Sequence, residues 1–307
     1  MNTVNIEEAD LNLLKIFEAL YQEGGASRAA VRCGLTQSAV SAALGRLRMM
    51  YGDPLFVRTG RGLSPTLRAN ELMPLIGEAL DKCRQSLAMA STQAASYAGR
   101  SVAIGLSDDF ELAVGARLID AVARLAPGLR LVFRQTYSSV VADMLMARAF
   151  DLGLTSGGLS SRALRRETFG EGTYACLVEA ESLGDGQTAL SVDDYLQRGH
   201  VLISSGGFVG MVDEMLAAKG LQRRVLASST HFSAVPFLLP GSSAVATIPL
   251  HAARVLAAHT SLRLLPCPLD VPRYSIELGW RVDSLRDPAV KLVKAALGEL
   301  LREMAWR

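Results

Sequence analysis

The chain has 307 residues, half of them hydrophobic and a fifth charged, with a net charge of +2. This length allows two or three domains, and this composition is typical of a folded globular protein. The most apolar stretch, residues 234–258, is interrupted by prolines and polar side chains, whereas a membrane span needs about 20 apolar residues in sequence. The start of the chain has no basic segment followed by an apolar run, as a signal peptide would have. We therefore expect a cytoplasmic protein that does not enter a membrane.

The cysteines are far apart and form neither a CxxC pair nor a zinc-binding pattern; they are Cys33, Cys83, Cys176 and Cys267. We expect no metal and no cofactor. Reduced thiols are the simplest interpretation, and a redox-responsive thiol stays open as an alternative. The sequence also lacks a G-x-S-x-G elbow, a Walker loop and a G-x-G-x-x-G motif, so we expect no enzyme activity and no catalytic residues.

Positive charge is concentrated between Ala26 and Arg68. This segment contains seven arginines against one acidic residue, Asp53, which gives a local charge of +6. A basic block inside a nearly neutral protein favours a polyanionic partner. A solvated basic face would have the same composition and stays open as an alternative.

Three short helices are predicted before residue 52. Asp10, Ser27 and Thr36 stand where helix N-caps are expected, and Gly24 and Gly34 stand where the first two helices should end. Two short helices joined through a glycine turn are typical of a helix-turn-helix.

The third of these helices has two different faces. Apolar residues recur at spacings of four, three and four, which predicts a buried stripe of Val40, Leu44, Leu47 and Tyr51. Another arc is small and polar and contains Gln37, Ser38, Ser41, Ala42 and Gly45. Such a thin face fits the DNA major groove, where glutamine can pair with adenine and serine can donate or accept. The helix N-terminus itself favours phosphate.

A hairpin is predicted next, with strands at residues 55–58 and 63–65 around a glycine-flanked turn. Arg58 and Arg61 stand on or beside this hairpin, where they can contact the DNA backbone or the minor groove.

Residues 10–69 resemble the winged helix-turn-helix of LysR-type transcriptional regulators. The matching motifs are DLNLLKIFEAL, ASRAA, LTQSAVSAALGRLR and DPLFVRTGRGLSPT, and they resemble the branch of nodulation, aromatic-catabolism and efflux regulators. The resemblance implies base contacts from Gln37, Ser38 and Ser41. Many members carry proline where Ser38 stands and a larger polar residue where Ala42 stands. The predicted DNA-binding set is Arg28, Thr36, Gln37, Ser38, Ser41, Arg48, Arg58 and Arg61.

A long helix is predicted from Thr66 to about residue 93. Its apolar side chains alternate at spacings of four and three from Ala69 to Ala90, which is typical of a coiled-coil seam. Pro74 lies inside this helix and should kink or break it. We predict that the helix dimerises through Met73, Ile76, Leu80, Cys83 and Leu87. Packing against the chain's own body is the alternative.

From about residue 98, short apolar strands alternate with helices, which predicts parallel sheets covered by helices. This part resembles the regulatory half of the same family. The resemblance implies an α/β chain: an N-terminal winged helix-turn-helix, a long linker helix and a C-terminal periplasmic-binding-protein-like two-lobed regulatory domain. The predicted domains are residues 1–66, 67–97 and 98–307. Within the last, lobe 1 comprises residues 98–169 and 272–307, and lobe 2 comprises residues 170–271.

Ligands of parallel sheets bind at the carboxyl ends of the strands. The candidate effector-binding residues there are Ser107, Asp108, Phe110, Thr155, Ser204, Ser205, Phe208, His231, Phe232 and Thr247. Hydroxyls, phenylalanines and a histidine suit a small, partly aromatic effector. Ser107 and Asp108 could instead be helix caps, and His231 could be a structural histidine. Asp108 and Asp109 would oppose an anionic ligand unless they are paired or turned away.

The sequence as a whole predicts a sequence-specific LysR-type regulator, modulated by an effector between its lobes. Its expected partners are double-stranded DNA with a pseudo-palindromic site, a small-molecule effector and further copies of itself in a dimer or tetramer. RNA polymerase is a further candidate. A DNA-binding repressor without an effector and a thiol-based redox regulator are the alternatives.

Overall fold

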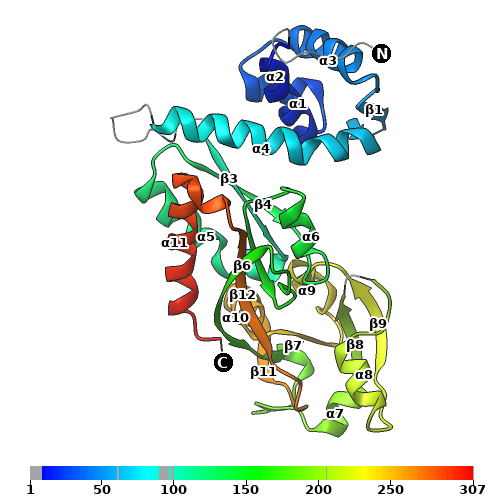
Figure 1. Ribbon diagram of the computed structural model, residues 1–307. Helices are drawn as coiled ribbons and strands as arrows, with labels where there is room; N and C mark the ends of the chain where they lie inside the picture. Colours follow the sequence, from blue (N-terminus) through cyan, green and yellow to red (C-terminus); the bar gives the residue numbers. More distant parts are fainter. Residues whose placement is uncertain (1–8, 61, 90–96, 98–99, 205, 307) are drawn as a thin grey trace. The chain divides into compact units, whose positions relative to one another are not determined.

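The computed structural model of the protein describes residues 9–60, 62–89, 97, 100–204 and 206–306 (Figure 1). It divides into two compact units, Met1–Ala95 and Ser96–Arg307. Within the described residues, no helix combines the length and the apolar character that crossing a membrane requires.

The N-terminal unit is a helical core with a hairpin. Its elements are α1 (Asn12–Glu23), α2 (Ala26–Cys33), α3 (Gln37–Tyr51), β1 (Phe56–Thr59), β2 (Gly62–Pro65) and α4 (Leu67–Met89). Apolar side chains from all three short helices, the residues around β1 and the first half of α4 form one buried cluster. The order of elements is that of a winged helix-turn-helix, as the sequence predicts.

The local helix signals were right at some positions and displaced at others. Thr36 caps α3, and its Oγ1 accepts a hydrogen bond from the Ala39 N–H at 3.2 Å. Gly24 and Gly34 end α1 and α2 in the left-handed conformation. Ser27 does not cap α2: the helix begins at Ala26, so Ser27 lies inside it, and Gly25 holds the cap position two residues before the predicted one. Glycine is an acceptable N-cap residue because its backbone adopts the required extended conformation easily.

The predicted seam of α4 is divided between two environments. Met73, Ile76 and Leu80 are buried within the N-terminal unit, where α4 packs against α1. These three side chains are therefore covered by their own unit, which was the alternative to dimerisation. Cys83 and Leu87, further along, are exposed. The helix continues through Pro74 without a break.

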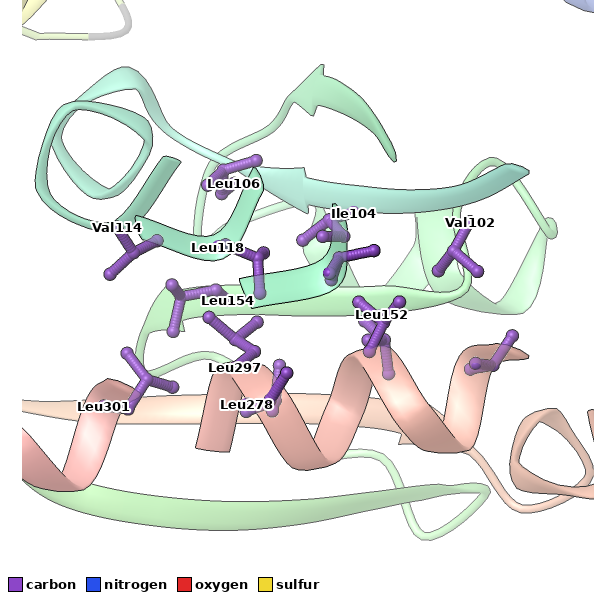
Figure 2. Close-up of a cluster of buried hydrophobic side chains, with 14 of the residues drawn as sticks. Val102, Ile104, Leu106, Val114, Leu118, Leu152, Leu154, Leu278, Leu297 and Leu301 are labelled. Atoms are coloured by element: carbon purple, nitrogen blue, oxygen red, sulfur yellow. The ribbon is translucent and has the colours of Figure 1, made fainter. Parts of the chain in front are cut away.

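Lobe 1 of the C-terminal unit is a sheet with strand order β4-β3-β5-β12-β6. The strands are β3 (Ser101–Leu106), β4 (Arg130–Gln135), β5 (Leu152–Ser156), β6 (Leu164–Gly172) and β12 (Tyr274–Arg281). The helices of this lobe are α5 (Asp108–Leu125), α6 (Val141–Met146), η3 (Ser284–Arg286) and α11 (Pro288–Glu303). Leucine, isoleucine and valine side chains of β3, β5 and β12 pack against α5 and α11 (Figure 2).

Lobe 2 is a sheet with strand order β11-β7-β10-β8-β9. The strands are β7 (Tyr174–Glu179), β8 (Gly199–Ile203), β9 (Arg224–Ser229), β10 (Val245–Pro249) and β11 (Leu262–Pro266). Its helices are α7 (Val192–Gln197), α8 (Met211–Ala217), α9 (Val235–Leu238) and α10 (Leu250–His259), with short turns η1 (Ala180–Ser182) and η2 (Phe232–Ala234).

Neither sheet is wholly parallel, which corrects the expectation from the alternating pattern. β3 pairs in parallel with β4 and β5, and β8 with β9 and β10. β12 and β7, by contrast, pair antiparallel with both of their neighbours. The chain passes from lobe 1 to lobe 2 between β6 and β7 and returns between β11 and β12. β7 and β12, the first strands after the two crossings, therefore run against the parallel core of their sheets, whereas β6 and β11, the last strands before the crossings, run in the same direction as that core.

Candidate DNA-binding face and effector site

The polar arc of α3 is on the surface, as its composition predicts. Gln37, Ser38 and Ser41 are exposed, while Val40 and Leu47 on the other side of the helix have no exposed surface. The hydroxyls of Thr36 and Ser38 lie 3.0 Å apart, so the helix begins with a hydrogen-bonded pair of hydroxyls beside the Gln37 amide. The N-terminal end of α3 thus exposes hydrogen-bond donors and acceptors of the kind that can contact base edges in the major groove.

The hairpin is fixed to the helical core by a close backbone contact. The Leu63 N–H donates to the Gly24 carbonyl at 2.8 Å. Gly62 has a φ of 134°, and a Cβ at this position would lie 2.5 Å from the same carbonyl oxygen. Only glycine allows the hairpin to approach the end of α1 this closely.

Asp53, the acidic residue of the basic block, organises the start of the hairpin. Its Oδ1 accepts hydrogen bonds from the Leu55 N–H at 2.6 Å and from the Thr66 hydroxyl at 2.8 Å. Leu55 is buried with a φ of 58°, which is unusual for a residue with a side chain. Asp53 therefore joins the beginning of β1 to the beginning of α4, so that the hairpin and the long helix share one anchor.

The predicted arginines have different environments. Arg48 donates to the carbonyls of Pro54 and Phe56, each at 2.9 Å, so this arginine positions the hairpin. Arg28 donates to the Glu23 carbonyl at 2.7 Å. Arg58 is exposed on β1, and Arg61 lies outside the described residues.

In the C-terminal unit, the start of α5 carries the first candidate effector residues. The Ser107 hydroxyl hydrogen-bonds Asp109 rather than capping the helix backbone. Asp108 Oδ2 accepts from the Ser233 N–H of lobe 2 at 2.9 Å, whereas its Oδ1 is buried without a hydrogen-bond partner. Asp108 and Asp109 are thus largely occupied by protein groups, which answers how two carboxylates are tolerated at this helix start.

Asp109 is the centre of a buried connection between the lobes. Its Oδ2 lies 3.1 Å from His251 Nε2 at the start of α10, and both side chains are almost fully buried. His251 Nδ1 is 3.3 Å from the Tyr274 hydroxyl at the start of β12. Burial raises the pKa of Tyr274 above its ordinary value, and the Asp109 charge adds to this. The cluster joins α5 of lobe 1 to α10 of lobe 2, close to the return crossing of the chain.

Several predicted effector residues are used by the protein itself. Phe110 has no exposed surface and stacks on the His251 ring with centroids 4.7 Å apart. The Thr155 hydroxyl donates to the Gly157 carbonyl. The Thr247 hydroxyl lies 2.7 Å from that of Tyr195, inside lobe 2. Phe110 in particular is a core residue, because it belongs to the buried cluster of lobe 1 and its ring also meets His251 of lobe 2.

The remaining candidates lie at more open positions. The Ser204 hydroxyl donates to the Gly206 carbonyl, and Ser205 lies outside the described residues. Phe208 is well exposed, His231 is exposed beside Thr230, and Phe232 is half-buried against the core of lobe 2. A hollow of about 360 Å³ lies elsewhere, between α5 and α11, and none of the predicted effector residues lines it.

Sequence reasoning missed His251, Tyr274 and Ser233 as partners of the α5 start. They stand 142, 165 and 124 residues after Asp109 in the chain, and no local motif marks them. Only the two crossings between the lobes bring these side chains to one place. The pair of aspartates after β3 was the one signal that could have suggested an unusual environment.

Comparison with known proteins agrees with this architecture. The model of the bacterial regulatory helix-turn-helix protein, lysR family, matches residues 11–70, and that of the LysR substrate binding domain matches residues 96–302. Nodulation protein D 1 of Rhizobium leguminosarum bv. phaseoli is 32% identical over 277 residues, covering 88% of this chain and 86% of the relative. The HTH-type transcriptional activator NahR of Pseudomonas putida is 29% identical over 293 residues, covering 93% and 95%.

Solved structures show the same fold over nearly the whole chain. A probable transcriptional regulator of Pseudomonas aeruginosa has a TM-score of 0.72 at 27% identity, covering 94% of this chain and 98% of that one. CbnR in complex with its target DNA has a TM-score of 0.63 at 14% identity, covering 95% and 100%, and shows a shared fold. The expectation of a regulator instead of an enzyme is confirmed. The two domains, their order and these relatives show that the chain belongs to the LysR family of transcription regulators.

Proposed function

We propose that this regulator binds a pseudo-palindromic DNA site, with the exposed start of α3 contacting base edges and the hairpin contacting the flanking phosphate backbone. The observation that carries this proposal is the α3 surface: Gln37, Ser38 and Ser41 are exposed together at the free N-terminus of a helix whose other face is buried. Arg58 on the hairpin, and Arg61 by sequence, add positive charge for phosphate contacts. Arg28, Thr36 and Arg48, the other residues of the predicted DNA-binding set, form hydrogen bonds within their own unit.

The protein acts as a dimer or tetramer in this proposal, because two reading heads are needed for two half-sites. Exposed Cys83 and Leu87 of α4 are the part of the predicted seam that a second copy can cover. RNA polymerase is a proposed further partner, and the cytoplasm is the proposed location.

A small effector, bound between lobes 1 and 2, is proposed to change how the DNA-binding units of the oligomer are placed relative to one another. The Asp108–Ser233 and Asp109–His251 contacts both join the lobes, so a ligand that favours another lobe arrangement has defined contacts to act on. Ser204, Phe208, His231 and Phe232 are proposed to contact it, since they are the candidates that the protein core uses least.

A footprint on the DNA next to the protein's own gene, at physiological salt with competitor DNA, tests the first part. We expect protection of two half-sites whose centres are one helical turn, or a multiple of it, apart. Diffuse protection that competitor abolishes would mean that the basic block binds backbone alone. For the effector, a ligand that binds the folded state must raise the unfolding temperature; an unchanged temperature across hydroxylated aromatic compounds would favour a repressor without an effector.

A further inference from the structure

Lobe 2 contains a pair of cysteines that are not among the residues proposed above to contact DNA or an effector. Cys176 lies in β7, opposite Leu265 of β11 in the antiparallel ladder. Side chains two residues apart on a strand share a face, so Cys267 continues the face of Leu265. Cys176 and Cys267 are therefore diagonal neighbours, and both pack in the same cluster. The two thiols are close enough to perturb each other's pKa.

The sequence around Cys267 holds its thiol in this position. Pro266 and Pro268 flank it, and a residue before proline is restricted to extended conformations. The direction of β11 is thereby continued to Cys267. β11 is an edge strand of its sheet, and edge strands are where sheets tolerate proline.

The two thiols differ in access and in surroundings. Cys176 has no exposed surface, whereas Cys267 is only partly buried. Cys176 Sγ lies 3.7 Å from the Thr247 hydroxyl, which in turn lies 2.7 Å from the Tyr195 hydroxyl. Arg223 donates to that tyrosine oxygen at 3.2 Å and forms a buried ion pair with Asp213. A positive group thus stands at the inner end of this chain of polar side chains.

These surroundings favour ionisation of the outer thiol. The hydrogen bond from Cys176 lowers the pKa of Cys267 to about 7, against the effect of burial, and a backbone hydrogen bond from Leu269 and the charge of Arg223 contribute in the same direction. The same hydrogen bond and burial raise the pKa of Cys176. A partly exposed thiolate beside a buried protonated thiol is the arrangement in which one sulfur reacts first and the other completes a disulfide.

We propose that Cys176 and Cys267 form a hydroperoxide-oxidisable pair that closes a disulfide between β7 and the end of β11. The Cys267 thiolate attacks one peroxide oxygen and the O–O bond breaks, which produces a sulfenic acid. The departing oxygen takes a proton from water and leaves as alcohol or water. The Cys176 sulfur then attacks the Cys267 sulfur. The S–S bond forms, the S–O bond breaks, and the oxygen leaves as water with the Cys176 proton. Two thiols lose two electrons, and the peroxide gains them.

Closure of the disulfide requires a small movement. Diagonal neighbours in a sheet have Cα atoms about 7–8 Å apart, and a disulfide needs about 4.4–6.8 Å, so the backbone must shift by on the order of 1 Å. Cys267 lies beyond the last ladder residue of an edge strand, where such a shift disturbs few hydrogen bonds. Oxidation would then fasten β11 to β7 beside the crossing that returns to lobe 1.

The test uses the full-length protein with Cys33 and Cys83 replaced by serine, so that no other thiol can pair. Reduced protein is treated with hydrogen peroxide, unfolded in iodoacetamide and analysed by intact mass and peptide mapping. We expect loss of two hydrogen atoms, no alkylation, and a cross-linked peptide containing both cysteines. Sulfinic acid on Cys267 together with an alkylated Cys176 would overturn the proposal. These masses do not depend on DNA or effector binding, so failure of the proposed function leaves this test intact.

A second measurement isolates the role of the hydrogen bond. The rate at which iodoacetamide alkylates Cys267 in the folded protein is measured as a function of pH, in the same Cys33→Ser, Cys83→Ser background. The midpoint should lie near 7, remain low in Cys176→Ser, which keeps a donor, and rise toward the ordinary thiol value in Cys176→Ala. Equal midpoints in the serine and alanine variants would show that Cys176 does not activate Cys267, and would contradict the pair.

Discussion

At the scale of single residues, the reading face depends on side chains whose surroundings leave them free to contact a base. Thr36 is committed to capping α3 and Arg48 to holding the hairpin. Gln37 is exposed beside them, and its amide can both donate and accept, which suits adenine in the major groove. Of the polar residues at the start of α3, Gln37 therefore offers the sharpest test of base reading.

Gln37→Ala should weaken binding to the cognate site by about 1–3 kcal/mol and relax its sequence preference. The reason is the loss of a base contact, while the phosphate contacts remain. Affinity for the cognate site and for random DNA is measured at one salt concentration. Gln197→Ala is a matched control, since it removes an exposed glutamine at the end of α7 in the other unit. Equal losses on both DNAs would refute base reading by Gln37.

At the scale of elements, helix caps, helix ends and the hairpin were predicted correctly where they depend on residues close together in the chain. The Thr36 cap, the glycine ends of α1 and α2, and the β1–β2 hairpin all depend on residues within a few positions of each other. The 4-3 pattern of α4 predicted a continuous apolar seam, of which Met73, Ile76 and Leu80 are buried, whereas Cys83 and Leu87 are exposed. It could not say what covers that seam, because periodicity describes one surface only; for Met73, Ile76 and Leu80 the cover is the chain's own core.

The strand β6 was not predicted, and its place in the sheet explains this. Its sequence, LRRETFGEG, contains four charged residues, and it forms the edge of the lobe 1 sheet. An edge strand with polar side chains lacks the apolar run by which buried strands are recognised. The same limit applies to the Asp109–His251 connection, which no local pattern encodes.

The docking of the hairpin offers a prediction at this scale. Gly62→Ala should destabilise the hairpin by about 1–3 kcal/mol, since alanine is strained at a positive φ and its Cβ would lie 2.5 Å from the Gly24 carbonyl oxygen. Hydrogen exchange at the Leu63 amide, which bonds that carbonyl, should become faster, and DNA binding should weaken.

Gly60→Ala is the matched control in the same turn, because a Cβ there meets nothing within 4 Å. If both alanine variants exchange the Leu63 amide at the rate of the parent, the hairpin is not held by the Gly62–Gly24 approach.

At the scale of the whole molecule, the two lobes of the regulatory unit have separate cores and are joined by a small mixed contact. The buried cores of lobe 1 and lobe 2 are separate clusters, although Leu112 of α5 packs against the core of lobe 2 and the rings of Phe110 and His251 stack. Asp108, Asp109 and His251 form hydrogen bonds across the boundary. Polar contacts are directional and can be exchanged for contacts with a ligand or with water. This distribution suits a unit whose lobes change their relative arrangement while each keeps its own fold.

The stability of this unit should also respond to pH through a buried histidine. His200 in β8 has no exposed surface, and burial, helped by the charge of Arg223, lowers its pKa from 6.5 to about 4. The folded protein therefore keeps His200 neutral, while the unfolded chain binds a proton as the pH falls below 6.5. The contribution of neutral His200 to the free energy of unfolding is fully present above pH 6.5 and is lost as the pH falls toward 4.

Between pH 7.5 and pH 5.0, His200 should therefore reduce the free energy of unfolding by about 2 kcal/mol. Urea unfolding is followed by tryptophan fluorescence, since Trp280 and Trp306 both belong to the C-terminal unit. His200→Gln removes the titrating group, so its stability should change less between these pH values than that of the parent. Because other carboxylates and histidines titrate equally in both proteins, the difference between the two slopes isolates His200. Parallel slopes would mean that His200 is protonated in the folded lobe, and that its burial does not keep it neutral.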